Sequence, residues 1–267
     1  MSAAPFETRG LASSAALLRT RARHEGPLLG IENLTHTYPG ADAPALAPTS
    51  LEVRAGEIVA LTGPSGVGKT TLLNAVMGFL APTGGQVTGH GEPVGRLPHW
   101  REQLAYVGQE PGLLSGTVAD NVRMGFPHAT DAAVADALRR AGATDLPVDQ
   151  AIGDDAEGVS AGERRRIAVA RALLRVTLGR AKLLVLDEPT AGLDADTEAD
   201  LLHSLRALGV AALVVTHRPA VLAEADRVVR LEFAASTVPE EPVSPASGRH
   251  EGPRSPQDRG WHEGLRR

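Results

Sequence analysis

A glycine-rich stretch between an apolar run and a helix-forming run has the residues needed to bind a phosphate group. Residues 63–71 read GPSGVGKTT, the preceding residues 58–61 read IVAL, and residues 72–77 read LLNAVM. Glycines allow the chain to turn tightly enough to aim successive N–H groups at one point, where the start of a helix adds partial positive charge. Lys69 would reach the outer phosphates of a nucleotide, and the Thr70 hydroxyl would bind Mg²⁺. The residues expected to contact the nucleotide are Gly63, Pro64, Ser65, Gly66, Val67, Gly68, Lys69, Thr70 and Thr71.

Two adjacent carboxylates follow a second apolar run. Asp187 and Glu188 come directly after residues 183–186, which read LLVL and are typical of a parallel strand covered on both faces. Open α/β sheets bind their ligands at the carboxyl ends of such strands. Consecutive strand residues point to opposite faces, so Asp187 is suited to hold Mg²⁺ and Glu188 to deprotonate an attacking water. The alternative is a solvated pair of acids before a turn, which the phosphate-binding loop disfavours.

Three further residues carry weaker signals when each is taken alone. Ser160 precedes an expected helix whose first amides could bind a phosphate together with its hydroxyl. His217 follows the apolar residues at 213–215, a position where a histidine is more often structural than catalytic. Tyr38 closes an expected strand, where an aromatic residue more often packs against its neighbours than binds a base.

Composition limits the classes of protein to consider. The chain has 267 residues, which suits one large domain with tails, and it has no cysteine for a disulfide or a thiolate metal site. A net charge of -5 and 3% aromatic residues argue against a nucleic-acid partner. The arginines at 164–166 are interpreted as a solvated helix face. No run approaches the ~18 apolar residues that span a bilayer, no secretory signal is recognised, and the cytosol is the expected compartment.

The order of expected elements indicates an α/β fold. Strands are expected at 29–38, 51–54, 57–61, 86–88, 104–107, 182–187, 213–216 and 227–231, and helices from 69 to about 78 and at 117–124, 130–141, 161–175 and 197–208. The prediction is a parallel sheet with an antiparallel β portion near the N-terminus and an inserted helical subdomain at about 96–176. Residues 1–27 form an extension with a short helix near 13–23, residues 28–234 the domain, and residues 235–267 a disordered tail or linker.

Taken together, the motifs resemble those of an ABC-transporter nucleotide-binding domain, a P-loop ATPase. Residues 159–163, VSAGE, lie where that family has its Leu-Ser-Gly-Gly-Gln signature, and the resemblance covers about 28–233. It implies ATP and Mg²⁺ as cofactors. The resemblance agrees with the roles given above to Thr70 and Asp187 at the metal and to Glu188 as the catalytic base. It also implies roles for four other residues. Tyr38 would stack on adenine, and Gln109 would sense Mg²⁺ and the membrane partner and lie at the metal. Asp194 would belong to the D-loop, and His217 would be the catalytic switch histidine.

The resemblance also implies partners. In this family the signature of one domain covers ATP held by another, so Ser160 and Gly162 would act on a second nucleotide-binding domain, in a homodimer or a heterodimer. Ala161 and Glu163 depart from the family pattern. Glu163 places a carboxylate in the first helical turn, where it interacts favourably with the helix dipole but repels a phosphate. A transmembrane subunit would complete the transporter and hold the chain at the inner face of the cell membrane.

Two regions resemble particular members of the family. Residues 109–118, QEPGLLSGTV, with Asn121, are similar to the exporter form of the Q-loop region. Residues 216–220 and 225–229 are most similar to the bacterial cysteine and glutathione exporter of the CydD/CydC type. The membrane part is then either a separate chain or a lost half of a longer protein. The alternatives are a soluble ABC ATPase without a transport role and a weakly hydrolysing module that dimerises with ATP.

Overall fold

A five-stranded parallel sheet forms the centre of the computed structural model, which describes residues 26–189 and 195–233. The strand order is β11-β3-β10-β9-β6, and each neighbouring pair is parallel. Residues of β9 and β10 are buried on both faces, as their continuous apolar sequences predict. The bounds are β3 (Ile58–Thr62), β6 (Leu104–Val107), β9 (Leu183–Asp187), β10 (Ala211–Val215) and β11 (Arg227–Arg230).

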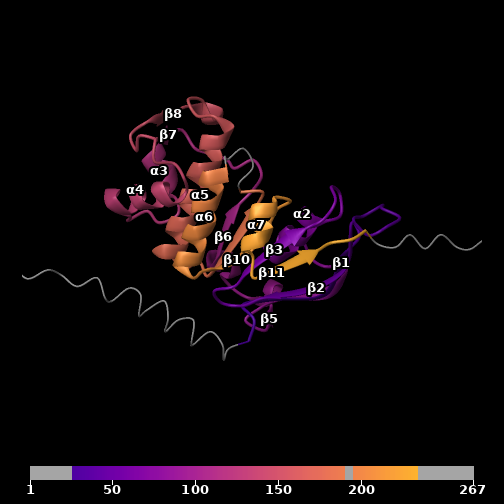
Figure 1. Cartoon of the computed structure of the whole chain (residues 1–267). Coiled ribbons are helices and arrows are strands. Elements are labelled where there is room, and N and C mark those ends of the chain that lie inside the picture. Colours follow the sequence, from indigo (N-terminus) through magenta and orange to yellow (C-terminus); the bar gives the residue numbers. More distant parts are fainter. Residues whose placement is uncertain (1–25, 190–194, 234–267) are drawn as a thin grey trace, which may run out of the picture. The chain divides into compact units, whose positions relative to one another are not determined.

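An antiparallel sheet covers one side of this centre, with helix α2 (Lys69–Val76) between the two sheets (Figure 1). Side chains from both sheets and from α2, among them Leu29, Leu72 and Leu213, form one apolar core. The expected strand at 51–54 begins earlier than predicted, at Leu46. The strands are β1 (Leu29–His36), β2 (Leu46–Val53), β4 (Gly84–Gly89) and β5 (Glu92–Pro93), in the order β2-β1-β4-β5.

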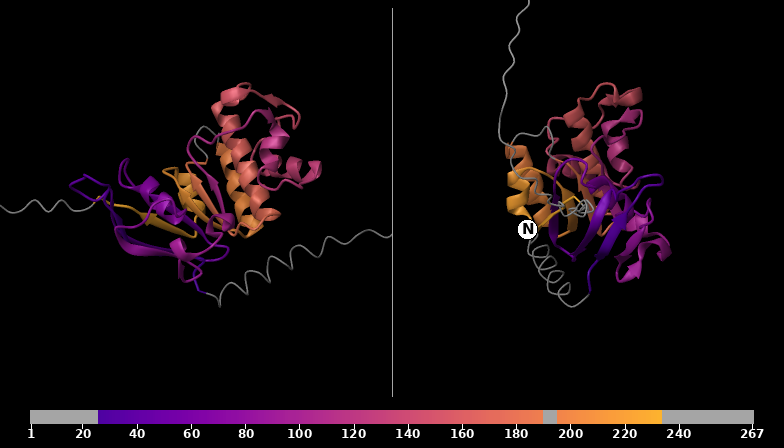
Figure 2. Two further views of the ribbon diagram at one scale, coloured as in Figure 1. Left: turned by 180° about the vertical axis from the view of Figure 1, so that it is seen from behind. Right: turned by 90° about the vertical axis from the view of Figure 1, so that its right-hand side faces the viewer.

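Helices cover the other face of the parallel sheet and extend into a helical lobe (Figures 1 and 2). Leu184 and Leu186 of β9 face this second core, whereas Leu183 and Val185 face the first, as strand periodicity requires. At Gly125 a Cβ would lie 2.1 Å from the carbonyl oxygen of Arg171, so glycine permits the close approach there. The lobe and its neighbours are β7 (Gly116–Thr117), α3 (Val118–Arg123), α4 (Asp131–Arg140), β8 (Ala151–Ile152), α5 (Ala161–Thr177), α6 (Ala195–Leu208) and α7 (Pro219–Glu224).

The predicted fold class is confirmed: a parallel sheet, an antiparallel β portion and a helical insert. Sequence reasoning missed the short elements, namely β5, β7, β8, α7 and the 3₁₀ turns η1 (Val94–Arg96), η2 (Trp100–Gln103) and η3 (Asp154–Ala156). The expected helix near 13–23 and the expected tail at 235–267 lie outside the described residues. None of the helices within the described ranges combines the length and apolar character needed to cross a bilayer.

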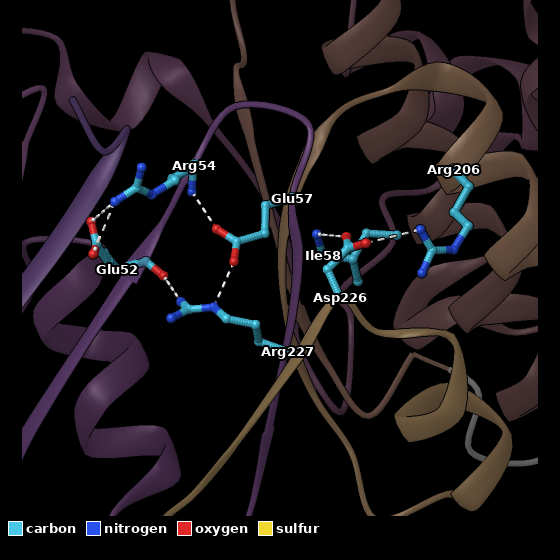
Figure 3. A network of polar contacts seen from close by, with 7 residues as sticks. All are labelled: Glu52, Arg54, Glu57, Ile58, Arg206, Asp226 and Arg227. Atoms are coloured by element: carbon cyan, nitrogen blue, oxygen red, sulfur yellow. Dashed lines mark hydrogen bonds and ion pairs between the residues drawn. The ribbon is translucent and has the colours of Figure 1, made fainter. Parts of the chain in front are cut away.

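Polar contacts hold the edge strand β11 at its start (Figure 3). Glu57 accepts a hydrogen bond from Arg227 Nε at 2.6 Å and one from the Arg54 N–H at 2.8 Å. The Asp226 carboxylate accepts one from the Ile58 N–H at 2.8 Å and one from Arg206 Nη1 at 3.2 Å. Because β11 is largely exposed, these contacts supply much of what joins it to the β2–β3 turn and to α6.

Replacing Asp226 by Ala is expected to lower the free energy of unfolding by about 2 kcal/mol, because the Ile58 N–H and Arg206 each lose an acceptor. Urea unfolding followed by circular dichroism measures the change. Glu232→Ala is the matched control, since this exposed acid has no hydrogen bond among the described residues. Equal stability of the two variants would show that the Asp226 contacts contribute nothing.

Candidate functional site

A cleft of about 460 Å³ lies at the carboxyl ends of β3, β9 and β10, where parallel sheets bind ligands. It brings together the predicted loop, both acids, Gln109 and His217. Sequence reasoning did not identify Ala45 or Thr216 as lining residues. The lining consists of Ala45, Gly63, Ser65, Gly66, Gly68, Lys69, Thr70, Thr71, Gln109, Asp187, Glu188, Thr216 and His217.

The loop between β3 and α2 requires glycine at two positions. Gly63 has φ 150°, and a Cβ there would lie 2.8 Å from the carbonyl oxygen of Leu231. Gly68, the N-cap of α2, has φ 100°, and a Cβ there would lie 2.4 Å from the carbonyl oxygen of Ala45. Side chains at these positions would therefore push the loop away from its neighbours. The first N–H groups of α2 have no partner within the helix and can bind an anion at this end.

Lys69 bridges the loop from the first residue of α2. Its Nζ donates hydrogen bonds to the carbonyl oxygens of Gly63 and Pro64, each at 2.8 Å. These two hydrogen bonds hold the ammonium group at the cleft. An anion bound in the loop would gain a charge-assisted hydrogen bond from a donor whose position is already set.

The two acids occupy different environments, as strand alternation predicts. Asp187 is 7% exposed, and burial raises the pKa of its carboxyl, with a further increase from the charge of Glu188 and a partial decrease from Lys69. The Glu188 N–H donates to the carbonyl oxygen of Val215 at 2.9 Å, and its Oε1 lies 2.9 Å from Nδ1 of His217. The side chain of Glu188 is 14% exposed and that of His217 is 71% exposed, so the pair runs from the largely buried wall of the cleft to the solvent-exposed surface.

Glu188 also has a backbone conformation that the sequence did not reveal. Its φ is 54°, in the left-handed region that a side chain other than glycine enters at a cost of about 1–2 kcal/mol. Such strain is typical of functional positions, where the surrounding structure holds it. Here the hydrogen bonds to Val215 and His217 hold the residue at the edge of the cleft.

The cleft has the oxygen ligands that Mg²⁺ prefers. The Thr70 hydroxyl, the Asp187 carboxylate and the Gln109 amide line the same cavity. Within residues 26–189 and 195–233, no group of three or more His, Cys, Asp or Glu side chains is placed to hold a metal. This set suits an ion that keeps waters and shares phosphate oxygens, as Mg²⁺ does, and a cation there would offset the unfavourable charge of the buried Asp187.

Tyr38 lies beside the cleft, outside its described lining. Its hydroxyl is 3.3 Å from Oγ1 of Thr71 in α2. The residue is 42% exposed, and its ring makes an edge-to-face contact with His36, with centroids 4.6 Å apart and an interplanar angle of 79°. The contacts with Thr71 and His36 thus hold the Tyr38 side chain in place, while a part of it remains exposed to a ligand.

Ser160 and Gly162 belong to a different part of the surface and do not line the cleft. Ser160 caps α5, its hydroxyl accepting from the Glu163 N–H at 3.2 Å and its own N–H donating to Glu163 Oε2 at 2.7 Å. These hydrogen bonds lower the pKa of Glu163, so its carboxylate is charged beside Ser160. Asp194 lies outside the described residues.

The arginines at 164–166 are not the solvated helix face that the sequence suggested. All have half-buried side chains. Arg164 Nη2 donates to the carbonyl oxygen of Asp155 at 3.0 Å, and Arg165 Nη2 donates to that of Gln109 at 2.8 Å. The interpretation failed because a run of like charges does not show which carbonyl groups the fold brings to the helix. Arg165 thereby joins α5 directly to a residue of the cleft.

Comparison with known proteins agrees with this geometry. Residues 46–191 match the model of the family described as ABC transporter. The chain belongs to the ABC transporter family. The chain is similar to the solved structure of a bacterial Atm1-family ABC exporter with ATP bound, with a TM-score of 0.70 at 29% identity, over 84% of this chain and 42% of the other. The chain is thus an ABC-type ATPase of the exporter type.

Curated relatives include exporters with different names. The ATP-dependent lipid A-core flippase of Ralstonia nicotianae is 41% identical over 217 residues, covering 76% of this chain and 36% of the flippase. The glutathione/L-cysteine transport protein CydD of Haemophilus influenzae is 38% identical over 188 residues, covering 68% of this chain and 31% of CydD. The chain thus spans about a third of the length of these relatives, and similarity to a thiol exporter is one resemblance among several.

Proposed function

We propose that this chain binds Mg-ATP in the cleft, hydrolyses it and supplies the energy for a membrane exporter. The observation that carries the proposal is the meeting of the phosphate-binding loop, Asp187 and the Glu188–His217 pair in one cavity. In this proposal the ATP-binding domain comprises residues 28–234, with the helical subdomain at about 96–176, residues 1–27 are an N-terminal extension, and residues 235–267 are a tail or linker.

The loop and its neighbours would bind the nucleotide. Lys69 and the first amides of α2 would bind the outer phosphates, with Gly63, Pro64, Ser65, Gly66, Val67, Gly68 and Thr71 shaping the loop around them. The open part of the Tyr38 ring would stack on adenine. Thr70, Asp187 and Gln109 would hold Mg²⁺, which when bound neutralises phosphate charge and orients the γ-phosphate.

Glu188 would act as the general base. Its carboxylate can accept a proton from a water placed at the γ-phosphate, while His217 fixes one of its oxygens. His217 is exposed enough to contact the nucleotide as well. This division follows the geometry, because Glu188 is the acid bonded to His217 and Asp187 is the buried one beside the expected Mg²⁺.

A second nucleotide-binding domain would complete the site. Ser160 and Gly162 lie outside the cleft of their own chain, so their phosphate-binding groups are available to ATP held by a partner, in a homodimer or a heterodimer. Asp194 would take part in the contact between the two domains. The carboxylate of Glu163 beside Ser160 favours a second candidate, a module that dimerises with ATP and hydrolyses it slowly.

The proposed transporter includes a membrane partner and a transported substrate. A transmembrane subunit, or a membrane domain of a longer chain, would hold this domain at the inner face of the membrane. Small thiols are one candidate cargo, supported by residues 216–220 and 225–229 and by the CydD relative. The lipid A flippase relative supports an amphipathic lipid equally well. An ATPase without a transport role is disfavoured by the similarity to exporters.

Two measurements test the proposed function. Release of inorganic phosphate from Mg-ATP by the full chain separates an efficient ATPase from the slow dimerising module. Chemical crosslinking in native membranes, followed by mass spectrometry, identifies the partner. Recovery of an integral membrane protein with export-type helices supports transport, and a chain that remains wholly soluble and uncrosslinked contradicts it.

A further inference from the structure

Hydrogen bonds from the helical lobe hold the segment that carries Gln109. This segment follows β6 and leads to β7, and Gln109, its first tethered residue, lines the cleft. Two arginines of α5 donate to its main chain: Arg165 Nη2 to the carbonyl oxygen of Gln109 at 2.8 Å, and Arg171 Nη1 to that of Gly112 at 3.2 Å. One helix therefore sets the path of the segment at two points.

The far end of the segment is held by the same lobe. Buried Asn121 of α3 accepts from the Leu114 N–H at 2.9 Å and donates to the Leu114 carbonyl oxygen at 2.8 Å. Arg171 donates to Asn121 Oδ1 at 3.1 Å, which links the two tethers. These contacts anchor Leu114, but they lie five positions beyond Gln109. At Gln109 itself, among the described residues, the side chain that reaches the main chain is Arg165.

We propose that Arg165 is a positioning residue for the Mg-nucleotide site. By holding the carbonyl oxygen of Gln109, its guanidinium orients that residue so that the amide side chain stays at the cleft, which Thr70 and Asp187 also line. The proposal rests on the proposed function, in which Gln109 contributes to the binding of Mg²⁺. Arg165 would thus have a structural role, which the interpretation of residues 164–166 as a solvated helix face did not predict.

The chemistry of the contact supports this role. A charged donor gives a stronger hydrogen bond to a carbonyl than a neutral donor does. Gln109 and its neighbour Glu110 are exposed, so burial does not hold this stretch in place. Arg165 lies in the second turn of the helix that Ser160 caps. The tether therefore joins the cleft of one chain to the surface that the same chain would present to a partner.

The test measures nucleotide affinity at controlled Mg²⁺ in the full chain. Fluorescence titration with a ribose-labelled ATP is carried out in EDTA and then at increasing Mg²⁺. For Arg165→Ala we expect unchanged affinity for ATP in EDTA. Added Mg²⁺ increases the affinity for ATP, and the Mg²⁺ concentration that gives half of this increase should rise about tenfold in the variant. A shift of this size is typical of losing a hydrogen bond to a charged group. Arg164→Ala, which removes the same charge one residue away and a bond to Asp155, should match the unaltered chain.

Two further variants sharpen the result. Arg165→Lys keeps a charged N–H donor and is expected to recover part of the loss. In a double-mutant cycle, Arg165→Ala should raise the Mg²⁺ requirement little further in a chain that already carries Gln109→Ala, because both substitutions act through the Gln109 side chain. Full additivity would overturn the proposal, and so would an Arg165→Ala titration identical to that of Arg164→Ala.

Folding and the proposed function are controlled separately. If Arg165→Ala does not fold, as judged by thermal melting, Arg165→Lys is compared with Arg164→Lys, with a shift of about threefold expected in the Mg²⁺ requirement. No difference between these two would overturn the proposal. If the unaltered chain binds the labelled ATP equally with and without Mg²⁺, the role of Arg165 is rejected, whereas the proposed function is wrong only if the unaltered chain binds no labelled ATP or releases no phosphate from Mg-ATP.

Discussion

Replacing Glu188 by Gln is expected to reduce ATP turnover by about 10²–10⁴-fold while ATP binding is retained. Glutamine has nearly the same shape, and its amide oxygen can still meet Nδ1 of His217, which lies 2.9 Å from Glu188 Oε1. What it lacks is the ability to accept a proton from water. Phosphate release under saturating Mg-ATP measures turnover, and equilibrium titration with ATP measures binding.

Glu110→Gln is the matched control for this substitution. It removes a carboxylate from the residue next to Gln109, but Glu110 does not line the described part of the cleft. Its turnover should equal that of the unaltered chain. If Glu188→Gln also hydrolyses ATP at the normal rate, Glu188 is not the base.

Replacing Lys69 by Ala is expected to weaken ATP binding by about 10–100-fold, the range typical of a hydrogen bond to a charged group. Lys69 Nζ lies between two carbonyl oxygens at 2.8 Å, a position for a compact ammonium group. Lys69→Arg should therefore restore little of the affinity, because a planar guanidinium does not occupy the same space. Isothermal titration calorimetry with Mg-ATP measures the affinity.

The other lysine of the chain provides the control. Lys182 is exposed, precedes β9 and lies away from the ATP cleft, so Lys182→Ala has the same change of charge without loss of a phosphate ligand. Its affinity for ATP should be unchanged. A Lys69→Ala chain that binds ATP as well as the Lys182→Ala chain would show that phosphates do not occupy the loop.

The sequence was sufficient to predict the features that depend on local pattern. The loop at 63–71 combines glycine spacing with a strand-to-helix context, and the apolar run before Asp187 indicates a buried parallel strand. The strand ends then meet at one edge of the sheet because the strands are parallel, so Lys69 and Asp187 lie in one cleft. The order of strands and motifs along the sequence was therefore enough to predict that Lys69 and Asp187 lie close together.

The features that it did not reveal depend on tertiary contacts. The bond between Glu188 and His217 joins residues 29 positions apart, and the bond between Arg165 and Gln109 joins residues 56 positions apart. The positive φ of Glu188 comes from the surrounding fold, since glutamate does not favour it. The run at 164–166 was misread for the same reason: charge suggests solvent, but the fold supplies carbonyl groups. The early start of β2 likewise follows from its pairing with β1, in which His36 lies opposite Leu46.

The central claim is that the cleft is one half of an ATP site that a second chain completes. The most direct test is the mass in solution of the Glu188→Gln chain, measured by sedimentation velocity with and without Mg-ATP. The account predicts a change from the 27.8 kDa of one chain to about twice that mass when Mg-ATP is added, and loss of this change in a Ser160→Ala, Gly162→Ala background. A chain that is saturated with Mg-ATP and keeps the mass of a monomer, at concentrations well above its affinity for the nucleotide, would contradict it.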